Sequence, residues 1–359
     1  MGADVVSGLR LGGRWELISP IDAGAMGTVW HARDAADGSA VAAKIPAASL
    51  LVDAKMRARF LREVAAGQRV QHANVVRVLD HGETGGTVWM VMERLYGESL
   101  LARLRRSRLS VSQCLDVAIP VVAALDAVHS AGVVHRDVKP GNVFLCSDGA
   151  VKLIDFGIAR VLGDGTLTAH GDVVGTVRYA SPEQCLGHKV GPPADLYALG
   201  VVLFLLLTGR PPFVGEPDGV LVAHATQEAP RVRSLAPDVP APLDALVQQL
   251  LAKLPSQRPP DAAHLLADLQ VIRRMVAPRT PAPPPENTPP DGTVAEVTVQ
   301  QHAETYRLRW ELDRLASRRD DLVGAVARLE AELAVRRREL TTVSIRLDEV
   351  RRQLDAAEG

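Results

Sequence analysis

The chain has 359 residues, of which 47% are hydrophobic, 23% are charged and only 4% are aromatic. Its 41 basic residues balance 42 acidic ones, which argues against a partner recruited by bulk charge, such as nucleic acid or an anionic membrane surface. The three cysteines, Cys114, Cys146 and Cys185, form no C-x-x-C pair, so a disulfide framework or a zinc site is not expected and a reducing, cytoplasmic location is favoured.

No membrane span is expected. The longest apolar run, residues 201–207, is far shorter than the roughly 20 residues that a membrane span needs. The amino terminus lacks the apolar stretch of a signal peptide, and Val6 breaks the myristoylation pattern.

The first hundred residues predict short strands and one helix. Strands are expected over residues 14–21 and 28–34, and an Asp-Gly turn then leads into a third strand over residues 40–45. The composition of residues 54–70 is helical, and residues 87–95 have strand character. From about residue 98 to residue 275 the pattern is mainly helical, and the apolar run at 201–207 predicts a core helix.

A break follows the helical region. Residues 278–290 contain seven prolines, which predict an extended spacer of roughly 40 Å within a linker over 276–295. Apolar residues then recur at spacings of three and four, with only Arg319 and Arg336 in the seam, which predicts a coiled coil over 304–357. The residues of this seam are Leu308, Leu312, Leu315, Leu322, Val326, Leu329, Leu333, Leu340, Val343, Leu347, Val350 and Leu354. An amphipathic helix that folds back on the globular domain is the alternative.

A glycine-rich loop lies between the first two long strands. Gly24 and Gly27 are separated by small residues, as in half of a dinucleotide-binding loop. A dinucleotide loop, however, joins a strand to a helix, whereas this loop joins two strands. Its exposed amide groups suit a phosphate chain lying across the hairpin.

Lys44 lies inside an apolar strand and therefore needs an anion, because an unpaired buried ammonium is unfavourable. Glu63 on the following helix is one candidate partner. The alternative is a surface lysine on an edge strand.

Residues 133–142, VVHRDVKPGN, hold five ionisable or amide side chains in an apolar frame. Together with the glycine loop, VAAK at 41–44, LIDFGIA at 153–159 and SPEQ at 181–184, they resemble, in chain order, the eukaryotic-like Ser/Thr protein kinases of bacteria. The resemblance covers about residues 15–275. It implies an α+β, two-lobed kinase fold, with a small antiparallel sheet lobe plus one helix and a larger helical lobe.

The domain boundaries follow from this resemblance. We expect an N-terminal tail over residues 1–14 and a kinase domain over 15–275, with its N-lobe at about 15–95 and its C-lobe at about 96–275. The linker and the coiled coil come after it.

The resemblance also implies catalytic roles. Asp137 would accept the proton of the substrate hydroxyl, and Lys139 would contact the transferred phosphate. Lys44, held by Glu63, would bind the α- and β-phosphates of ATP. His135 would serve packing and hydrogen bonding. Two further residues, Asn142 and Asp155, offer oxygen ligands for Mg²⁺ or Mn²⁺.

Around the nucleotide, the resemblance places two residues above the adenine (Val29 and Ala42), Phe144 beneath it, and Met92 as gatekeeper. The backbone of Glu93 and Leu95 would pair with the base. The loop contributes Ile21, Asp22, Gly24 and Gly27. Asp22 replaces the first glycine of the family pattern, and its negative charge near a phosphate predicts weakened ATP binding.

Structural and regulatory residues complete the comparison. Glu183 is expected to pair with Arg258, and Asp195 to anchor the backbone of the His-Arg-Asp loop. Arg136 would bind a phosphate on the activation segment. The candidate acceptors are Thr166 and Thr168, while Thr176 resembles the threonine that bonds the catalytic loop.

The sequence thus predicts an active protein kinase with protein substrates that autophosphorylates in its activation segment. The coiled coil predicts a homo-oligomer, with a different partner chain as the alternative. A pseudokinase scaffold is the second reading of the whole chain, although Lys44, Glu63, Asp137, Asn142 and Asp155 are all present. A coiled-coil DNA-binding protein is disfavoured, because a proline-rich segment precedes the heptads in place of a basic region.

Overall fold

The computed structural model describes residues 6–24, 27–47, 54–155 and 177–276. All of them belong to the first of two compact units, Met1–Pro285, and the division falls inside the linker predicted for residues 276–295. The predicted coiled coil and Thr166, Thr168 and Thr176 lie outside the described residues.

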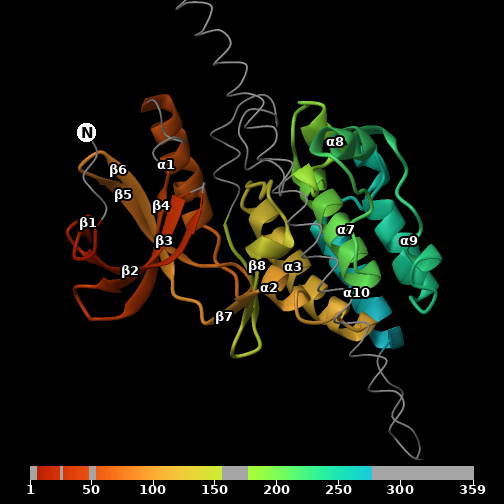
Figure 1. Ribbon diagram of the computed structural model, residues 1–359, viewed down its shortest axis with the longest axis horizontal. Coiled ribbons are helices and arrows are strands. Elements are labelled where there is room, and N and C mark those ends of the chain that lie inside the picture. The colour runs from red at the N-terminus through yellow and green to blue at the C-terminus, as the bar shows by residue number, and fades with distance from the viewer. Residues whose placement is uncertain (1–5, 25–26, 48–53, 156–176, 277–359) are drawn as a thin grey trace, which may run out of the picture. The chain divides into compact units, whose positions relative to one another are not determined.

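A six-stranded antiparallel sheet forms the N-lobe, with strand order β1-β2-β3-β4-β6-β5 (Figure 1). Its strands are β1 (Arg10–Leu11), β2 (Trp15–Gly24), β3 (Gly27–Asp34), β4 (Ala40–Pro46), β5 (Val78–Thr84) and β6 (Thr87–Glu93). The two end strands also meet. The amide N–H of Gly12 donates to Thr84 Oγ1 at 3.0 Å, and Trp15 Nε1 donates to Asp80 Oδ2 at 2.7 Å. The sheet therefore curls until its first and last strands touch.

Side-chain alternation explains where each face of this sheet is buried. On β6, Val88, Met90 and Met92 join the large core, whereas Trp89 and Val91 join a second cluster on the other face. This period of two is what a strand imposes. The second cluster contains Leu11, Trp15, Leu17, Trp30, Ala32, Val41, Ala43, Ile45, Trp89 and Val91.

Helix α1 (Ala54–Gln68) covers one face of the sheet. Its Phe60 and Val64 are 1% exposed and pack in the large core. The helix predicted over 54–70 is confirmed, and it lies on the face to which Lys44 points by alternation with Ala42.

The C-lobe is mainly helical, as predicted. Its helices are α2 (Leu100–Leu104), α3 (Val111–Ser130), α6 (Pro182–Cys185), α7 (Pro192–Thr208), α8 (Pro217–Thr226), α9 (Ala241–Leu250) and α10 (Ala262–Val276), with 3-10 turns η2 (Pro140–Asn142), η3 (Val232–Ser234) and η4 (Pro255–Gln257). A small sheet of β7 (Gly97–Ser99), β8 (Val143–Cys146) and β9 (Val151–Leu153) joins the lobes.

Helices α3 and α7 form the centre of this lobe (Figure 1). The predicted core helix at 201–207 is part of α7, which is apolar around most of its circumference and almost wholly buried. Among the described helices, α3 alone has the length and apolar composition of a membrane span, and half of the residues in its most apolar window are buried inside the protein.

One boundary differs from the expectation. Residues 10 and 11, assigned to an N-terminal tail, form β1, and Leu11 is fully buried. A strand of two residues is too short to produce an alternating pattern, so periodicity does not indicate it.

Candidate active site

The catalytic loop begins with two backbone amides held by one buried carboxylate. Asp195, in the first turn of α7, accepts from the N–H of His135 at 2.8 Å and from the N–H of Arg136 at 2.7 Å. Its Oδ2 also contacts His129 Nε2 at 2.8 Å. Asp195 thus makes the backbone contact that the sequence predicted.

Asp137 follows directly and is surrounded by donors. Asn142 Nδ2 donates to Asp137 Oδ2 at 2.9 Å and to the Asp137 carbonyl at 2.8 Å. Lys139 Nζ lies 2.7 Å from the same Oδ2. Two donors therefore hold one carboxylate oxygen, which fixes the direction of this side chain.

Asp155 lies on a second loop, after β9, and pairs with Lys44. Lys44 Nζ is 2.6 Å from Asp155 Oδ1. Burial alone would raise the pKa of Asp155, but the charges of Lys44 and Lys139 outweigh this effect and hold it below its ordinary value. Asp155 also has a φ of 53°, in the left-handed region that side chains rarely adopt. An ionised carboxylate is therefore held in a strained backbone conformation.

Two hydrogen bonds join the loops that carry these carboxylates. The N–H of Ile154 donates to the Asn142 carbonyl at 2.9 Å. His135 Nε2 lies 3.1 Å from the Ile154 carbonyl, and this buried ring has its pKa lowered by burial. His135 thus has the packing and hydrogen-bonding contacts expected of it, and the two loops are locked side by side.

The partner of Lys44 differs from the prediction. In this part of the chain, Lys44 pairs with Asp155 and makes no ion pair with Glu63, which lies half-buried on α1. Asp155 neutralises the ammonium here, and the contact of Lys44 with Glu63 stays a prediction for the nucleotide-bound chain.

Most of the residues expected around the adenine belong to the large core or pack against it. Ala42 on β4 is paired in register with Met92 on β6, and both are buried. Val29 and Leu95 pack against the same core, while Phe144 is half-buried on β8.

Glu93 makes contacts of its own at the end of β6. Its Oε1 accepts from the N–H of Arg77 at 2.8 Å and pairs with Lys152 Nζ at 2.7 Å. The side chain is therefore tied to β9 of the small sheet.

In the glycine loop, only one glycine is required by sterics. Gly27 has a φ of 121°, and an added Cβ would lie 2.1 Å from the Ile45 carbonyl. Gly24 has open space around it, and Ile21 and Asp22 are exposed on β2. Asp22 stands in register with Val29 across the hairpin.

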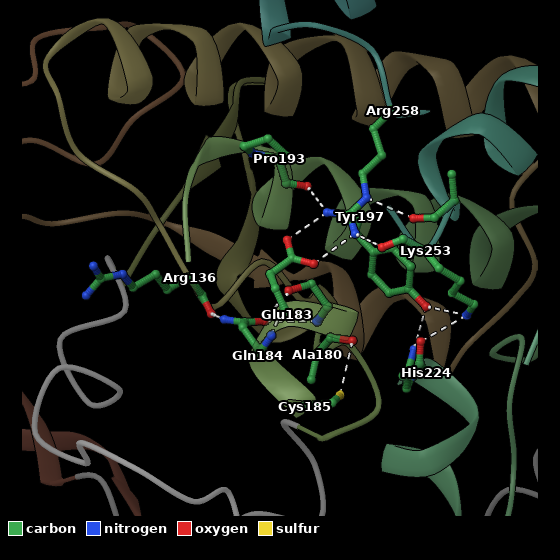
Figure 2. Close-up of polar contacts among 12 residues, drawn as sticks. Arg136, Ala180, Glu183, Gln184, Cys185, Pro193, Tyr197, His224, Lys253 and Arg258 are labelled. Atoms are coloured by element: carbon green, nitrogen blue, oxygen red, sulfur yellow. Dashed lines mark hydrogen bonds and ion pairs between the residues drawn. The ribbon is translucent and has the colours of Figure 1, made fainter. Parts of the chain in front are cut away.

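Behind the catalytic loop, Arg258 and Glu183 form a two-bonded ion pair, shown in Figure 2, with distances of 2.7 and 2.8 Å. The Arg258 side chain is fully buried and also donates to the carbonyl of Pro193. The structure therefore contains the pair expected from the sequence.

Two residues near the loop were not singled out by the sequence. His129 contacts Asp195, and Gln184 Nε2 donates to the Arg136 carbonyl at 3.1 Å. The available signal was the pattern Ser181-x-x-Gln184, a capping box at the start of α6.

The donors fit a nucleotide with a divalent cation. Asp155 is held as an anion, and the Nδ2 of Asn142 faces Asp137, which leaves the amide oxygen of Asn142 as a hard ligand. The ammonium of Lys44 already lies beside the Asp155 carboxylate. Asn142 and Asp155 would hold the divalent cation.

The comparisons with known proteins agree with this geometry. Residues 15–269 match the protein kinase domain family. The chain is 39% identical over 273 residues to a protein of Corynebacterium efficiens named "Probable serine/threonine-protein kinase", covering 73% of this chain and 41% of the relative. It is 37% identical over 301 residues to the serine/threonine-protein kinase PknA of Mycobacterium tuberculosis, covering 81% of this chain and 68% of PknA.

A solved structure is also similar. The crystal structure of the PknI kinase domain of Mycobacterium tuberculosis matches with a TM-score of 0.62 and 27% identity, covering 74% of this chain and 99% of that domain. The chain spans only about two fifths of the length of the Corynebacterium efficiens relative. By sequence match, fold and site, the chain belongs to the protein kinase family, among the eukaryotic-like serine/threonine-protein kinases of bacteria.

Proposed function

We propose that this chain transfers the γ-phosphate of ATP to serine or threonine hydroxyls of proteins. The observation that carries the proposal is the convergence of Asp137, Lys139, Asn142, Asp155 and Lys44 through short contacts between two loops and β4. Phosphoryl transfer needs positioning and electrostatic stabilisation more than covalent chemistry, and this set supplies both.

Asp137 is the residue that accepts the proton. One of its oxygens is held by Asn142 and Lys139, so the second can face a substrate hydroxyl. Lys139 neutralises charge on the transferred phosphoryl group and lies within reach of the same carboxylate.

ATP and a divalent cation, Mg²⁺ or Mn²⁺, are the proposed cofactors. Asn142 and Asp155 would hold the cation, which would supply positive charge to the phosphate oxygens. Lys44 then exchanges its contact with Asp155 for the α- and β-phosphates, and Glu63 becomes its carboxylate partner. The adenine lies between Val29, Ala42 and Phe144, beside Met92, and its edge meets the backbone of Glu93 and Leu95.

The threonines proposed to regulate the kinase lie outside the described residues. Thr166 and Thr168 are the proposed phosphate acceptors, with Arg136 as the charged partner, and Thr176 bonds the catalytic loop. A homo-oligomer formed through residues 304–357 raises the effective concentration of one kinase domain near another, which favours autophosphorylation. We place this activity in the cytoplasm, where ATP is available.

The test is transfer of label from radioactive ATP to a generic protein substrate and to the chain itself. The wild type is expected to transfer label, and Asp137→Asn to lose roughly a hundred-fold or more of the rate while still binding nucleotide. Asp148→Asn is the matched control, because Asp148 is an exposed aspartate in the turn between β8 and β9. Absence of label in the wild type as well as in Asp137→Asn would favour the scaffold.

A further inference from the structure

Gln184 connects the segment after the Ser-Pro-Glu motif to the catalytic loop. Figure 2 shows its side-chain amide pointing at the backbone of Arg136, and Nε2 donates to the Arg136 carbonyl oxygen at 3.1 Å. This bond spans 48 residues of sequence. The carbonyl belongs to the peptide unit that leads directly into Asp137.

That peptide unit is held at both ends. Its oxygen accepts from Gln184, and its nitrogen, the N–H of Asp137, lies 3.3 Å from His135 Nδ1. Because the peptide bond is planar, fixing the oxygen and the nitrogen also fixes the starting direction of Asp137 from its Cα.

The backbone at this point needs such support. Arg136 has a φ of 65°, and a residue with a side chain in the left-handed region carries a local energetic penalty. Asp195 holds the N–H of Arg136 from one side, and Gln184 holds its C=O from the other. The strained residue is thus clamped by two side chains that come from two different helices.

The orientation of Gln184 is itself fixed. Its Oε1 accepts from the N–H of Ser181 at 3.0 Å, as the second half of a capping box at the start of α6. The amide oxygen faces the helix start, so the amide nitrogen must face Arg136. The neighbouring Glu183 anchors α6 through its buried pair with Arg258.

We propose that Gln184 is a positioning residue for phosphoryl transfer, which acts by holding the peptide unit before Asp137. This inference rests on the proposed kinase activity. Substrate and nucleotide are not expected to touch Gln184, so its loss should lower kcat and leave the KM for ATP within about two-fold.

The decisive variant is Gln184→Glu. Glutamate is a standard residue at this position of a capping box, so it keeps the acceptor for the Ser181 N–H. An ionised carboxylate cannot donate, so the bond to the Arg136 carbonyl is lost. We expect kcat to fall roughly ten-fold or more. Gln184→Met, which is neutral and similar in size, should give the same direction.

The matched control is Ser181→Ala, which weakens the cap of α6 and leaves the bond from Gln184 to Arg136 in place. It removes the hydroxyl, which caps the N–H of Gln184 and also donates to Oε1 at 3.3 Å, but it keeps the shorter bond from the backbone N–H to Oε1 and the bond from Nε2 to Arg136. We expect a lower Tm for Ser181→Ala, with kcat within about two-fold of the wild type.

The outcomes separate cleanly when kcat, KM for ATP and Tm are measured together. Folded Gln184→Glu or Gln184→Met with wild-type kcat would overturn the inference. An equal fall in kcat for Ser181→Ala would also overturn it, because the stability of α6 would then explain the effect. A wild type that transfers no phosphate would instead refute the proposed function.

Discussion

At the scale of single residues, the ion pair of Glu183 and Arg258 is the contact whose loss is expected to destabilise the protein most. The Arg258 side chain is fully buried and that of Glu183 is 8% exposed, so removing either one leaves an uncompensated charge. Arg258→Ala is expected to lower the free energy of unfolding by about 3–5 kcal/mol, measured by urea denaturation.

A surface ion pair provides the comparison. Arg33 pairs with Glu16 while its side chain is 52% exposed, so Arg33→Ala should change the free energy of unfolding by about 1 kcal/mol or less. Similar values for the two variants would contradict the burial argument.

Asp22 gives a second prediction at this scale. It is exposed on β2, at the end of the hairpin that carries the glycine loop, and its charge opposes an approaching phosphate chain. Asp22→Gly and Asp22→Asn should both lower the KM for ATP several-fold, because both remove the charge. An unchanged KM in steady-state assays of both variants would show that Asp22 does not affect nucleotide binding.

Sequence reasoning located the residues that belong to family motifs and missed two residues that support the catalytic loop from outside the expected roles. Asp195 was found because it begins a motif-bearing helix, and its two bonds to the loop agree with that reading. Gln184 and His129 were missed, because their importance depends on which carbonyl or carboxylate lies beside them. The pairing of Lys44 with Asp155 was not expected either, because sequence spacing does not show which carboxylates lie near a given lysine.

At the scale of elements, the packing of α7 on α9 depends on a glycine. An added Cβ at Gly200 would lie 2.7 Å from Leu250 Cβ. Alanine is usually better than glycine inside a helix by about 1 kcal/mol, but here the contact forces the helices apart. Gly200→Ala should therefore lower the free energy of unfolding, by roughly 1–3 kcal/mol.

Gly219 in α8 is the matched control. It is also inside a helix, but apart from its chain neighbours and the backbone of its own helix nothing lies within 4 Å of its added Cβ. Gly219→Ala should stabilise the protein by up to about 1 kcal/mol. Thermal unfolding of both variants checks the prediction, and a stabilised Gly200→Ala would show that α7 and α9 can separate without loss.

A hydrogen-bonded chain joins α7, α8 and the segment before η4, as Figure 2 shows. Lys253 Nζ donates to the Tyr197 hydroxyl, and Tyr197 lies 2.9 Å from His224 Nδ1. His224 Nε2 lies 3.0 Å from the Arg178 carbonyl, which can only accept. A neutral imidazole with its proton on Nε2 satisfies this chain, with the Tyr197 hydroxyl donating to Nδ1.

The pH dependence of stability follows. Burial, helped by the charge of Lys253, lowers the pKa of His224 from 6.5 to about 4. Between these values the unfolded chain binds a proton that the folded chain does not, so stability falls as the pH drops from 6.5 towards 4. The contribution is about 3 kcal/mol at most. His135, whose pKa burial also lowers, adds to the same trend.

His224→Gln tests this directly. Glutamine keeps one donor and one acceptor but does not titrate, so unfolding free energies measured between pH 6.5 and 4 should fall less steeply than in the wild type. Identical slopes would mean that His224 is not the titrating group.

At the scale of the whole molecule, the sequence predicts two functions in one chain. The kinase domain ends before residue 285, where the chain divides into two units, and the predicted coiled coil begins at residue 304. The full chain is expected to sediment as a dimer or larger species at micromolar concentration, and a chain ending at Pro285 as a monomer. A monomeric full chain would contradict self-association through the heptads.

The two-lobed fold was predictable at this scale from the resemblance that the family motifs carry, and the expected strands, the one helix and the apolar helical region agree with it. The contacts that bring the first and last strands of the N-lobe sheet together were not predictable. The meeting of β1 with β5 depends on Trp15 reaching Asp80 and on Gly12 reaching Thr84, pairs that lie 65 and 72 residues apart. No local pattern carries such information.

That meeting has a practical consequence for anyone who shortens this protein. The family match starts at residue 15, yet Leu11 is buried inside the curled sheet and the N–H of Gly12 donates a hydrogen bond to Thr84 Oγ1. A fragment that starts at residue 15 would lack Leu11, which leaves an apolar cavity, and would lack β1, which leaves β2 as an exposed edge strand. Exposed edge strands promote aggregation. Expression should therefore begin no later than residue 6, where the described residues start.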